Sequence, residues 1–477
     1  MNWPQPNARG VFLVATMISF GTDGWRARLD GDFTEENVVR IADAAGALWA
    51  QTTPGAIVYV GFDTRPGAER YAVLAGEVLA AHGIVAKVST KPSPMPAISW
   101  AVANDVRSCG GLMVTGSHNP PDYLGIKFCL AGGATLTQDV TDALEAAIDP
   151  DATSARGPIA REDFVTPYLD HLCEAVDAEA IARAHLRVVY DPLYGAARGL
   201  VPDVLGALGV SVVEIHGHDD ADTADIHPDP IEPWIDDCEQ AVVAHGACAG
   251  LISDGDADRA GAVDEHGRYV APYKIIALLA EHLVNHHGLT GRVVVNQSTS
   301  VIARRAAAAL GCRVSVKPVG FKYIYEEMRK GDVLIGGEEA GGIGIPAYCP
   351  ERDGILANLL LCELMAISGK TLGELVDDLE RRFGATSYVR RDLRLENEVI
   401  EMFRTFLPGL NPQNVAGKTP VRVSHMDGLR LEFEDESWLL LRPSGTEPVV
   451  RVCAEAPTVE LRDALLDAGS ELARGDL

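Results

Sequence analysis

Three features of this 477-residue chain predict an α/β fold with mixed sheets, in which three related α/β domains precede a small α+β domain. A unit that joins two short Val- and Ile-rich runs through an amphipathic helix occurs three times. The C-terminal part instead carries a hairpin signature with further strands and one helix. The hydrophobic content of 47% is too high for disorder, and the length allows roughly three or four domains.

The repeated unit has one layout: an apolar run, a polar loop, a helix, a glycine and a second apolar run. This layout is typical of a β-α-β crossover between parallel strands. The first strands are expected at 56–60, 186–190 and 292–295, and the glycines that close the helices are Gly83, Gly209 and Gly311. Because the units begin near residues 57, 187 and 293, we assign each to its own domain rather than to one large sheet.

The C-terminal part is predicted to form the smaller domain. Runs at 421–426 and 429–433 flank Asp427-Gly428, which indicates a hairpin with a two-residue turn. Two strands and a helix complete the domain, at 438–441, 449–454 and about 459–473. Polar, aperiodic stretches near 150–160, 265–268 and 384–390 are read as linkers. The four domains are therefore predicted at 17–157, 158–267, 268–385 and 386–477.

Charge and cysteine usage limit the partners and the compartment. The net charge of −27 leaves no basic stripe for nucleic acid. Val11–Phe20 is too short to cross a membrane, and no other run approaches a span. Nine scattered cysteines without a C-x-x-C pair fit a reducing cytosol. Met17 directly precedes a motif-rich stretch, so we expect translation to start there and residues 1–16 to be dispensable.

The first candidate loop follows the apolar run Leu112–Val114 and contains Thr115-Gly116-Ser117-His118-Asn119-Pro120. A serine at the end of a buried strand is well placed to carry a phosphoryl group, with His118 or Lys127 moving the proton. The spacing differs from the hydrolase nucleophile elbow, which needs glycine two residues before and after the serine. The alternative is a polar turn capped by Ser and Asn.

The second candidate loop alternates carboxylates after a strand: Asp254, Asp256 and Asp258, followed by Arg259. Alternate carboxylates in a tight loop converge and suit a hard divalent cation, while the arginine suits a phosphate oxygen. An EF-hand is excluded, because its sixth position requires glycine and Arg259 occupies it. A solvated acidic turn is the alternative.

Two further loops are candidates for substrate binding. Gly336–Gly342 contains Glu338 and Glu339, and carboxylates between glycines can accept hydrogen bonds from paired sugar hydroxyls; Glu351–Gly354 follows it. Arg442–Pro448 combines two hydroxyls, a glycine and an arginine, with Arg451 beyond, which suits an anion. A common Gly/Glu loop and an exposed charged turn are the respective alternatives.

The four loops together indicate more than each loop does alone. A nucleophilic serine, a cation loop, a hydroxyl-binding loop and a phosphate-binding loop come one from each predicted domain. Phosphoryl transfer needs a carrier, a cation that neutralises charge, and groups that hold a charged substrate. Because a net charge of −27 repels anions at long range, local Arg and Lys side chains must hold the phosphate inside a cleft.

These residues resemble the α-D-phosphohexomutase family, which includes phosphoglucomutases, phosphomannomutases and phosphoglucosamine mutases. The resemblance extends from about Phe20 to the C-terminus. It rests on five segments in the family's order: Phe20–Arg26, Thr115–Pro120 with Gly125–Phe128, Asp254–Arg259, Gly337–Gly341 and Arg442–Pro448. It implies a cytoplasmic enzyme with four domains around a central cleft, acting on a phosphosugar as a monomer or homodimer.

The resemblance also implies roles for individual residues. Ser117 corresponds to the phosphoserine, and Ser117, Asp254, Asp256 and Asp258 correspond to the Mg²⁺ site. A hexose 1,6-bisphosphate is implied as intermediate and activator. The residues implied around the reacting groups are Arg26, His118, Lys127 and Arg352. Glu338 corresponds to the carboxylate that binds the sugar hydroxyls. The clamp on the non-reacting phosphate corresponds to Arg442, Ser444, Gly445 and Thr446, with Arg451 as a weaker addition.

Three positions depart from the family's pattern. Gly116 replaces the commoner Ala before the serine, and Leu124 stands where Asn is frequent. Ala340 replaces the usual Ser after the glutamate pair, so a hydroxyl contact to the sugar is lost. The consecutive glutamates are closer to glucose-handling members, which favours glucose 1-phosphate; phosphomannomutase and phosphoglucosamine mutase activities are the alternatives.

Two other classes of protein would share part of this pattern of residues. Asp254-x-Asp256 after a strand occurs in phosphatases with an aspartate nucleophile, but the threonine that normally follows is absent. A non-catalytic sugar-phosphate binder would keep the cleft but would need neither Ser117 nor three cation-binding carboxylates. If domain closure contributes to activity, we expect the hinge near Phe383–Arg390.

Overall fold

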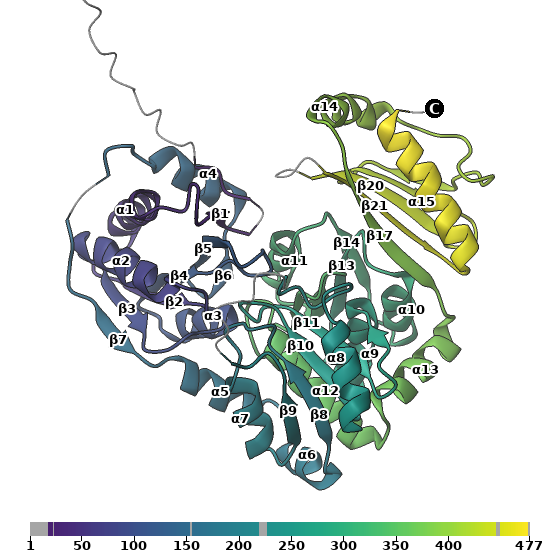
Figure 1. Ribbon diagram of the computed structural model, residues 1–477, viewed down its shortest axis with the longest axis horizontal. Helices are drawn as coiled ribbons and strands as arrows, with labels where there is room; N and C mark the ends of the chain where they lie inside the picture. The colour runs from purple at the N-terminus through teal and green to yellow at the C-terminus, as the bar shows by residue number, and fades with distance from the viewer. Residues whose placement is uncertain (1–17, 22, 153–154, 219–226, 445–448, 476–477) are drawn as a thin grey trace, which may run out of the picture.

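The computed structural model describes residues 18–21, 23–152, 155–218, 227–444 and 449–475. The proposed start at Met17 lies outside these residues. Four sheets organise the chain. In Figure 1 the first sheet lies at the left and the fourth at the upper right, with the second and third at the lower centre.

The first sheet has the order β1-β5-β4-β2-β3-β7, with β6 paired to β5. Its strands β2, β3, β4 and β7 are parallel, whereas β5 and β1 run antiparallel to their neighbours. The strands are β1 (Trp25–Arg28), β2 (Ile57–Phe62), β3 (Val85–Ser89), β4 (Ser108–Val114), β5 (Tyr123–Leu130), β6 (Ala134–Thr135) and β7 (Ala160–Glu162). The helices are α1 (Glu35–Thr52), α2 (Ala68–Ala81), α3 (Met95–Asn104) and α4 (Gln138–Ala147).

The second sheet has the order β12-β11-β10-β8-β9. Its strands are β8 (Arg187–Asp191), β9 (Ser211–Glu214), β10 (Ala249–Ser253), β11 (Ala260–Asp264) and β12 (Tyr269–Val270). The helices of this part are α5 (Val165–Glu174), α6 (Ala178–Ala184), α7 (Leu200–Ala207) and α8 (Asp236–His245).

The third sheet has the order β14-β13-β15-β16. Its strands are β13 (Arg292–Asn296), β14 (Val314–Lys317), β15 (Val333–Gly337) and β16 (Ile343–Gly344). Its helices are α9 (Pro272–Asn285), α10 (Val301–Ala309), α11 (Phe321–Met328), α12 (Gly354–Ser368) and α13 (Leu372–Phe383).

These three sheets share one connectivity, as the repeated unit predicts. Each contains a parallel β-α-β crossover: β2-α2-β3, β8-α7-β9 and β13-α10-β14. A second helix then leads to a strand parallel to the first one, namely β4, β10 or β15. Each of these strands turns back into an antiparallel partner, β5, β11 or β16. The predicted fold class, including three related α/β domains, is confirmed.

The fourth sheet is antiparallel, with the order β17-β21-β20-β19-β18. Its strands are β17 (Ser387–Arg394), β18 (Arg422–Ser424), β19 (Leu429–Glu432), β20 (Trp438–Pro443) and β21 (Val449–Ala456). Helix α15 (Val459–Arg474) packs on it through Leu465 and Leu466, and α14 (Asn397–Phe406) and a 3-10 turn (Leu407–Gly409) precede β18. This is the predicted α+β domain.

The structure corrects the predicted hairpin turn at Asp427-Gly428. β18 ends at Ser424 and β19 begins at Leu429, so the loop spans 425–428 rather than two residues. Gly428 has φ +93° and lies against the Leu441 backbone, where a Cβ atom would overlap the carbonyl oxygen. Asp427 Oδ2 accepts hydrogen bonds from Val319 N at 3.0 Å and Arg442 Nε at 2.8 Å, so the loop is shaped by contacts outside the hairpin.

Strands lie within or directly beside the segments read as linkers. β7 lies just beyond residue 157 but pairs with β3 of the first sheet, and β12 lies just beyond residue 267 but pairs with β11. β17 takes up most of 384–390, because Ser387–Arg394 pairs along its full length with β21. Only 384–386 lie between α13 and β17.

The nine cysteines are free thiols, five of them in buried positions of the sheets and helices and one, Cys349, in a buried loop. Among the described residues no single helix has the length and apolar composition of a membrane span. When α12 and α13 are taken together as one pair, bent by 83°, the pair meets these two criteria of length and composition.

Candidate active site

Ser117 lies in the turn that connects β4 to β5. Its side chain is fully buried, and its φ of 46° is unusual for a residue other than glycine. Thr115 Oγ1 accepts a hydrogen bond from Ser117 N at 2.7 Å, which helps to fix this conformation. Ser117 Oγ donates to Asp254 Oδ2 at 3.0 Å and lies 3.5 Å from His118 Nδ1. The turn therefore presents the hydroxyl directly to the aspartate loop of the second sheet.

Arg65 and Asp63, which the sequence analysis did not single out, hold this turn from the loop that follows the adjacent strand β2. The Arg65 guanidinium donates to the carbonyl oxygens of Ser117 at 2.7 Å, Asn119 at 2.6 Å and Tyr123 at 2.9 Å. Asp63 Oδ2 accepts from Thr115 Oγ1 at 2.8 Å. A signal was available, because β2 and β4 are neighbouring parallel strands and the loops that follow them meet at one sheet edge.

Asp254, Asp256 and Asp258 lie in the corresponding turn between β10 and β11. All three are buried, and one oxygen of each lies within 4.8 Å of the others. Gly255 packs against the Ser117 carbonyl so closely that a Cβ atom would overlap it. Asp256 Oδ1 and Asp258 Oδ1 are buried without a hydrogen-bond partner among the described residues. Unpartnered buried carboxylate oxygens fit a divalent cation that prefers oxygen ligands.

In an EF-hand that began at Asp254, Glu265 would be the ligand at the twelfth position. Its surroundings agree with the exclusion of an EF-hand. Its carboxylate accepts hydrogen bonds from Thr371 Oγ1 and from Gly373 N, the latter at 2.8 Å, at the start of α13. It therefore caps a helix, and β11 separates it from the three aspartates.

Four basic side chains face the aspartates. Lys127 Nζ lies 2.7 Å from Asp256 Oδ2 and 2.8 Å from Asp258 Oδ2, and also 2.9 Å from Asp23 Oδ2. Arg352 contacts the same Asp23 and Asp258 oxygens, both at 2.8 Å. The other two are Arg26, 3.4 Å from Asp23, and Arg259, 3.2 Å from Asp229. Asp23 and Asp229 thus join the site, although the sequence analysis gave neither a role.

The two candidates for proton transfer differ in protonation. Burial, together with Arg259, Arg26 and Lys127, holds the pKa of His118 well below its ordinary value, so the imidazole is neutral near pH 7. Burial alone would lower the pKa of Lys127, but the carboxylates of Asp23, Asp256 and Asp258 outweigh it and raise that pKa. A neutral imidazole can accept a proton, whereas the Lys127 ammonium can only donate one.

Glu338 lies in the third of these turns, between β15 and β16. Its Oε1 accepts from Gly320 N at 3.0 Å and from Asn296 Nδ2 at 3.3 Å, and burial raises its pKa. Arg352 Nη1 lies 3.9 Å from Glu338 Oε2 and thereby links the carboxylate to the aspartate loop. Ala340 is half-buried in the same turn. Backbone pairing of Arg259 with Gly342 connects this turn to the second one.

The loop predicted to bind phosphate, 442–448, is described only at its two ends. Arg442 on β20 and Arg451 on β21 are direct cross-strand partners, so their side chains share one face of the sheet. Arg442 Nε donates to Asp427 at 2.8 Å, and Arg451 Nε lies 4.0 Å from Asp392. Ser444 N donates to Val449 O at 2.8 Å, which closes the loop. Gly445 and Thr446 lie outside the described residues.

The structure brings most of the predicted site residues into one set of contacts. These are Ser117, His118, Lys127, Arg26, Asp254, Asp256, Asp258, Arg259, Arg352 and Glu338. Arg442 is connected to this set indirectly. It donates to Asp427, which also accepts from Val319 N, and the next amide, Gly320 N, donates to Glu338. Ser444 and Arg451 are not in direct contact with it.

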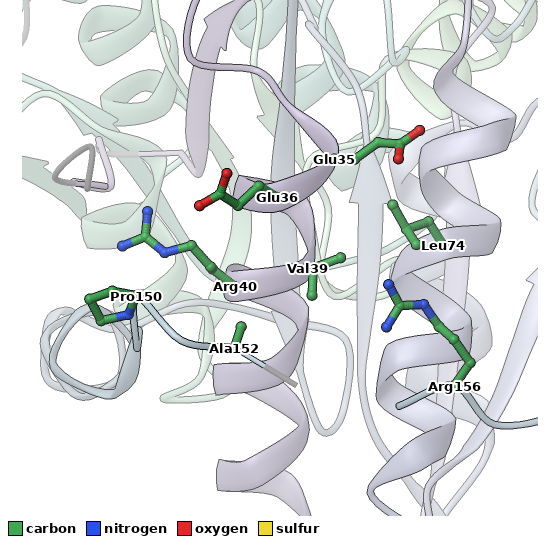
Figure 2. A pocket seen from close by; sticks show the side chains of 8 residues that line it. All are labelled: Glu35, Glu36, Val39, Arg40, Leu74, Pro150, Ala152 and Arg156. Carbon is green, nitrogen blue, oxygen red and sulfur yellow. The ribbon is translucent and has the colours of Figure 1, made fainter. Parts of the chain in front are cut away.

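A surface pocket elsewhere contains none of these residues. It has a volume of about 290 Å³ and lies beside α1 and α2, as Figure 2 shows. Its lining residues are Glu35, Glu36, Val39, Arg40, Leu74, Pro150, Ala152 and Arg156. The predicted chemistry therefore has no connection with this pocket.

Comparison with known proteins identifies the class to which this fold and site belong. Four models of the phosphoglucomutase/phosphomannomutase family match in order: α/β/α domain I at 17–154, domain II at 166–267, domain III at 271–383 and the C-terminal domain at 376–469. The chain belongs to this family, the α-D-phosphohexomutases. It is accordingly an isomerase of the mutase type.

Individual relatives extend over almost the whole chain. A phosphoglucomutase/phosphomannomutase of Thermococcus kodakarensis is 32% identical over 464 residues, which covers 95% of this chain and 98% of the relative. A phosphoglucosamine mutase of Parafrankia sp. is 35% identical over 480 residues, covering 93% and 96%. A solved structure from Thermus thermophilus, provisionally assigned as a phosphomannomutase, has a TM-score of 0.86 and 33% identity, covering 96% and 99%.

Proposed function

We propose that this enzyme interconverts the 1-phosphate and 6-phosphate of an aldohexose through a phosphoserine at residue 117. The observation that carries the proposal is the position of Ser117 Oγ, buried and 3.0 Å from Asp254 at the head of three convergent aspartates. In the first step a phosphoryl group leaves Ser117 Oγ and bonds to the free 6-hydroxyl oxygen of the 1-phosphate. The resulting 1,6-bisphosphate turns over in the site, and its 1-phosphoryl group returns to Ser117 Oγ.

Asp254, Asp256 and Asp258, with the Ser117 phosphoryl oxygens, would hold the cation. The unpartnered oxygens Asp256 Oδ1 and Asp258 Oδ1 support Mg²⁺, which prefers oxygen ligands. A bound Mg²⁺ would neutralise negative charge on the phosphoryl group during transfer. Lys127 and Arg352 contact these carboxylates, and Arg26 pairs with the neighbouring Asp23, so the three side chains would supply fixed positive charge to that group.

We assign the proton acceptor to His118 rather than Lys127. In the forward step the sugar hydroxyl loses its proton as its oxygen bonds to phosphorus, and in the return step the proton goes back. The support is that His118 has a lowered pKa and lies 3.5 Å from Ser117 Oγ, whereas Lys127 has a raised pKa. Glu338 would bind the sugar hydroxyls, and Arg442 with the 444–446 loop and Arg451 would hold the second phosphate.

For the sugar, we propose glucosamine phosphate rather than the glucose phosphate favoured by the glutamate pair alone. Phosphoglucosamine mutases recur among the relatives at 34 to 35% identity. The adjacent carboxylates Glu338 and Glu339 also suit the ammonium group of an amino sugar. Mannose phosphate is the second candidate, favoured by the Thermus thermophilus structure.

The proposal is tested by ³¹P NMR with each of the three hexose 1-phosphates, Mg²⁺ and a trace of the matching 1,6-bisphosphate. We expect the signal to move to the 6-phosphate, fastest with glucosamine. Ser117→Ala should reduce turnover by at least roughly 10³-fold and abolish the phosphopeptide, while Ser424→Ala on the fourth sheet should change neither. Release of inorganic phosphate that persists in Ser117→Ala would instead indicate a phosphatase with an aspartate nucleophile.

A tenfold preference for glucose or mannose 1-phosphate would overturn the sugar assignment but leave the mutase chemistry intact. No turnover with any of the sugars, together with no phosphate on Ser117, would favour a non-catalytic binder. We place the enzyme in the cytoplasm, since nine free thiols fit a reducing compartment. A monomer or homodimer stays the expectation for its oligomeric state.

A further inference from the structure

Three histidines and one glutamate meet on the third domain, away from the residues of the proposed active site. His282 lies in the last turn of α9, and His286 and His287 follow the end of that helix. Their rings are mutually 5.2 Å apart, measured between centroids. All three face Glu363 of α12, whose side chain is completely buried.

The contacts of Glu363 place two imidazole nitrogens on one carboxylate oxygen. Oε2 lies 2.6 Å from His282 Nε2 and 2.8 Å from His287 Nε2. The other oxygen, Oε1, accepts a hydrogen bond from Asp177 N at 2.5 Å, which fixes the carboxylate plane. His286 Nε2 lies 3.9 Å from Oε1, and its side chain is 34% exposed, so the cluster can be reached from solvent.

The contacts of His287 allow a tautomer in which Nε2 is an acceptor nitrogen that points into the cluster. Its Nδ1 lies 2.7 Å from Tyr348 Oη on the opposite side of the ring. When Nδ1–H donates to that oxygen, the lone pair of Nε2 faces the Glu363 carboxylate, and a cation between them removes the repulsion. A hydrogen bond that holds the second ring nitrogen is the usual outer support of a metal-binding histidine.

We propose that His282, His287 and Glu363 form a second cation site, for Zn²⁺ or a similar transition metal, with His286 as the fourth donor. One ligand atom from each of the first three residues lies within 4.8 Å of the others. Zn²⁺ binds imidazole nitrogen and carboxylate oxygen at about 2.0–2.2 Å, so small side-chain rotations suffice. Two or three imidazoles suit Zn²⁺ and disfavour Mg²⁺, which separates this site from the aspartates.

The site would connect two domains. Asp177 is the N-cap of α6, in the second predicted domain, and Glu363 binds its backbone amide. The histidines and Glu363 belong to α9, the residues after it, and α12 of the third. Helix α12 also begins directly after Arg352 and Asp353, so a metal at Glu363 would fix the helix that positions Arg352. The proposed role of the metal is therefore structural.

Cobalt provides a direct test on the full-length enzyme. The protein is stripped with a chelator, excess Mg²⁺ is added to fill the aspartate cluster, and Co²⁺ is titrated while the visible d–d absorption is recorded. We expect one equivalent to bind with the spectrum of a four-coordinate nitrogen and oxygen site, and Zn²⁺ to displace it. Zn²⁺ should also raise the thermal midpoint by at least about 3 °C.

Variants assign the signal to particular residues. His287→Asn and His286→Ala should weaken Co²⁺ binding at least tenfold and reduce the Zn²⁺-dependent rise. His82→Gln, which alters a histidine paired with Asp43 at 2.7 Å in the first domain, should change neither. Equal Co²⁺ binding by both cluster variants would overturn the proposal, as would no d–d absorption in the unaltered enzyme. A sulfur-to-cobalt charge-transfer band retained in His287→Asn would assign the metal to a cysteine and would also overturn it.

Discussion

At the scale of single residues, Arg65 gives a physical reason for a glycine directly before the serine. The Arg65 guanidinium lies against the Gly116 backbone, at the place that a Cβ atom would occupy. It is held there by hydrogen bonds to the backbone carbonyls of the serine turn and by Asp63, whose Oδ2 lies 3.3 Å from Arg65 Nε. The small residue therefore makes room for the arginine that shapes the turn.

Gly116→Ala should consequently impair both stability and turnover. The new methyl group must displace the guanidinium and break some of its hydrogen bonds, which we expect to cost on the order of 1–2 kcal/mol. Turnover should fall about tenfold or more, because Ser117 loses its fixed position. Thermal denaturation and steady-state kinetics measure the two effects.

The matched control is Gly206→Ala in α7, where an added Cβ atom meets no other atom within 4 Å. This change should leave turnover intact and raise stability slightly, because alanine favours the helix. Equal thermal midpoints and equal turnover for Gly116→Ala and Gly206→Ala would contradict the role assigned to Arg65.

At the scale of secondary-structure elements, the site is built from equivalent turns of the three related sheets. Ser117, the three aspartates and Glu338 each follow the third parallel strand of a sheet, where the chain turns back into an antiparallel strand. The sequence predicts these loops, because a short apolar run followed by glycines and polar residues is a local signal. The contacts of Arg65, in contrast, join separate elements, so no pattern within one segment of the sequence predicts them.

The strands that the sequence analysis missed also have a physical explanation. β17, Ser387–Arg394, contains three arginines and an aspartate, and most of its residues are only half-buried. The strand has no hydrophobic pattern of its own, and its pairing with β21 stabilises it instead. β7 is a three-residue edge strand with two exposed positions, so it lacks a periodic signal altogether.

Helix α11 supplies a prediction that depends on pH. Glu327 on this helix contacts Lys317 on β14, Lys330 at 2.6 Å and Arg292 on β13 at 2.8 Å. Burial alone would raise the pKa of Glu327, but these hydrogen bonds outweigh it and lower the pKa to about 2. Because the folded-state pKa lies below the ordinary value of 4.5, the stabilisation is present above pH 4.5 and is lost as the pH falls towards 2.

Glu327→Gln should therefore destabilise the protein near pH 7 by on the order of 2 kcal/mol. At pH 3 the difference from the unaltered protein should shrink to about half. Thermal midpoints at both pH values provide the measurement. Glu326→Gln, at the exposed neighbouring position of the same helix, should have little effect at either pH. A Glu327→Gln difference that stays constant or grows as the pH falls would contradict this assignment.

At the scale of the whole molecule, one buried carboxylate makes several of the contacts that attach the fourth domain to the third. Glu455 on β21 accepts hydrogen bonds from Val301 N at 2.9 Å and from Ser300 Oγ, at the start of α10. It also accepts from Trp438 Nε1 on β20 and from Thr386 in the connection between α13 and β17, both at 2.6 Å. The expected hinge near 383–390 thus includes a residue that this carboxylate holds.

Glu455→Gln should loosen this attachment without unfolding either domain. The amide keeps the size of the side chain but loses the negative charge and one acceptor oxygen, while four donors still point at it. We expect a loss of about 1–3 kcal/mol in the free energy of unfolding. Since Arg442 and Arg451 belong to the fourth domain, the KM for the hexose phosphate should rise more than kcat falls, and small-angle scattering should report a larger radius of gyration.

Glu436→Gln is the matched control, because Glu436 also connects the two domains, through Arg305, but its side chain is 59% exposed. An exposed ion pair contributes at most about 1 kcal/mol, so this variant should change stability and KM little. The comparison separates buried from exposed attachment with the same chemical change. If both variants behave alike, or if Glu455→Gln lowers kcat at constant KM and constant radius of gyration, Glu455 does not control how the fourth domain is held.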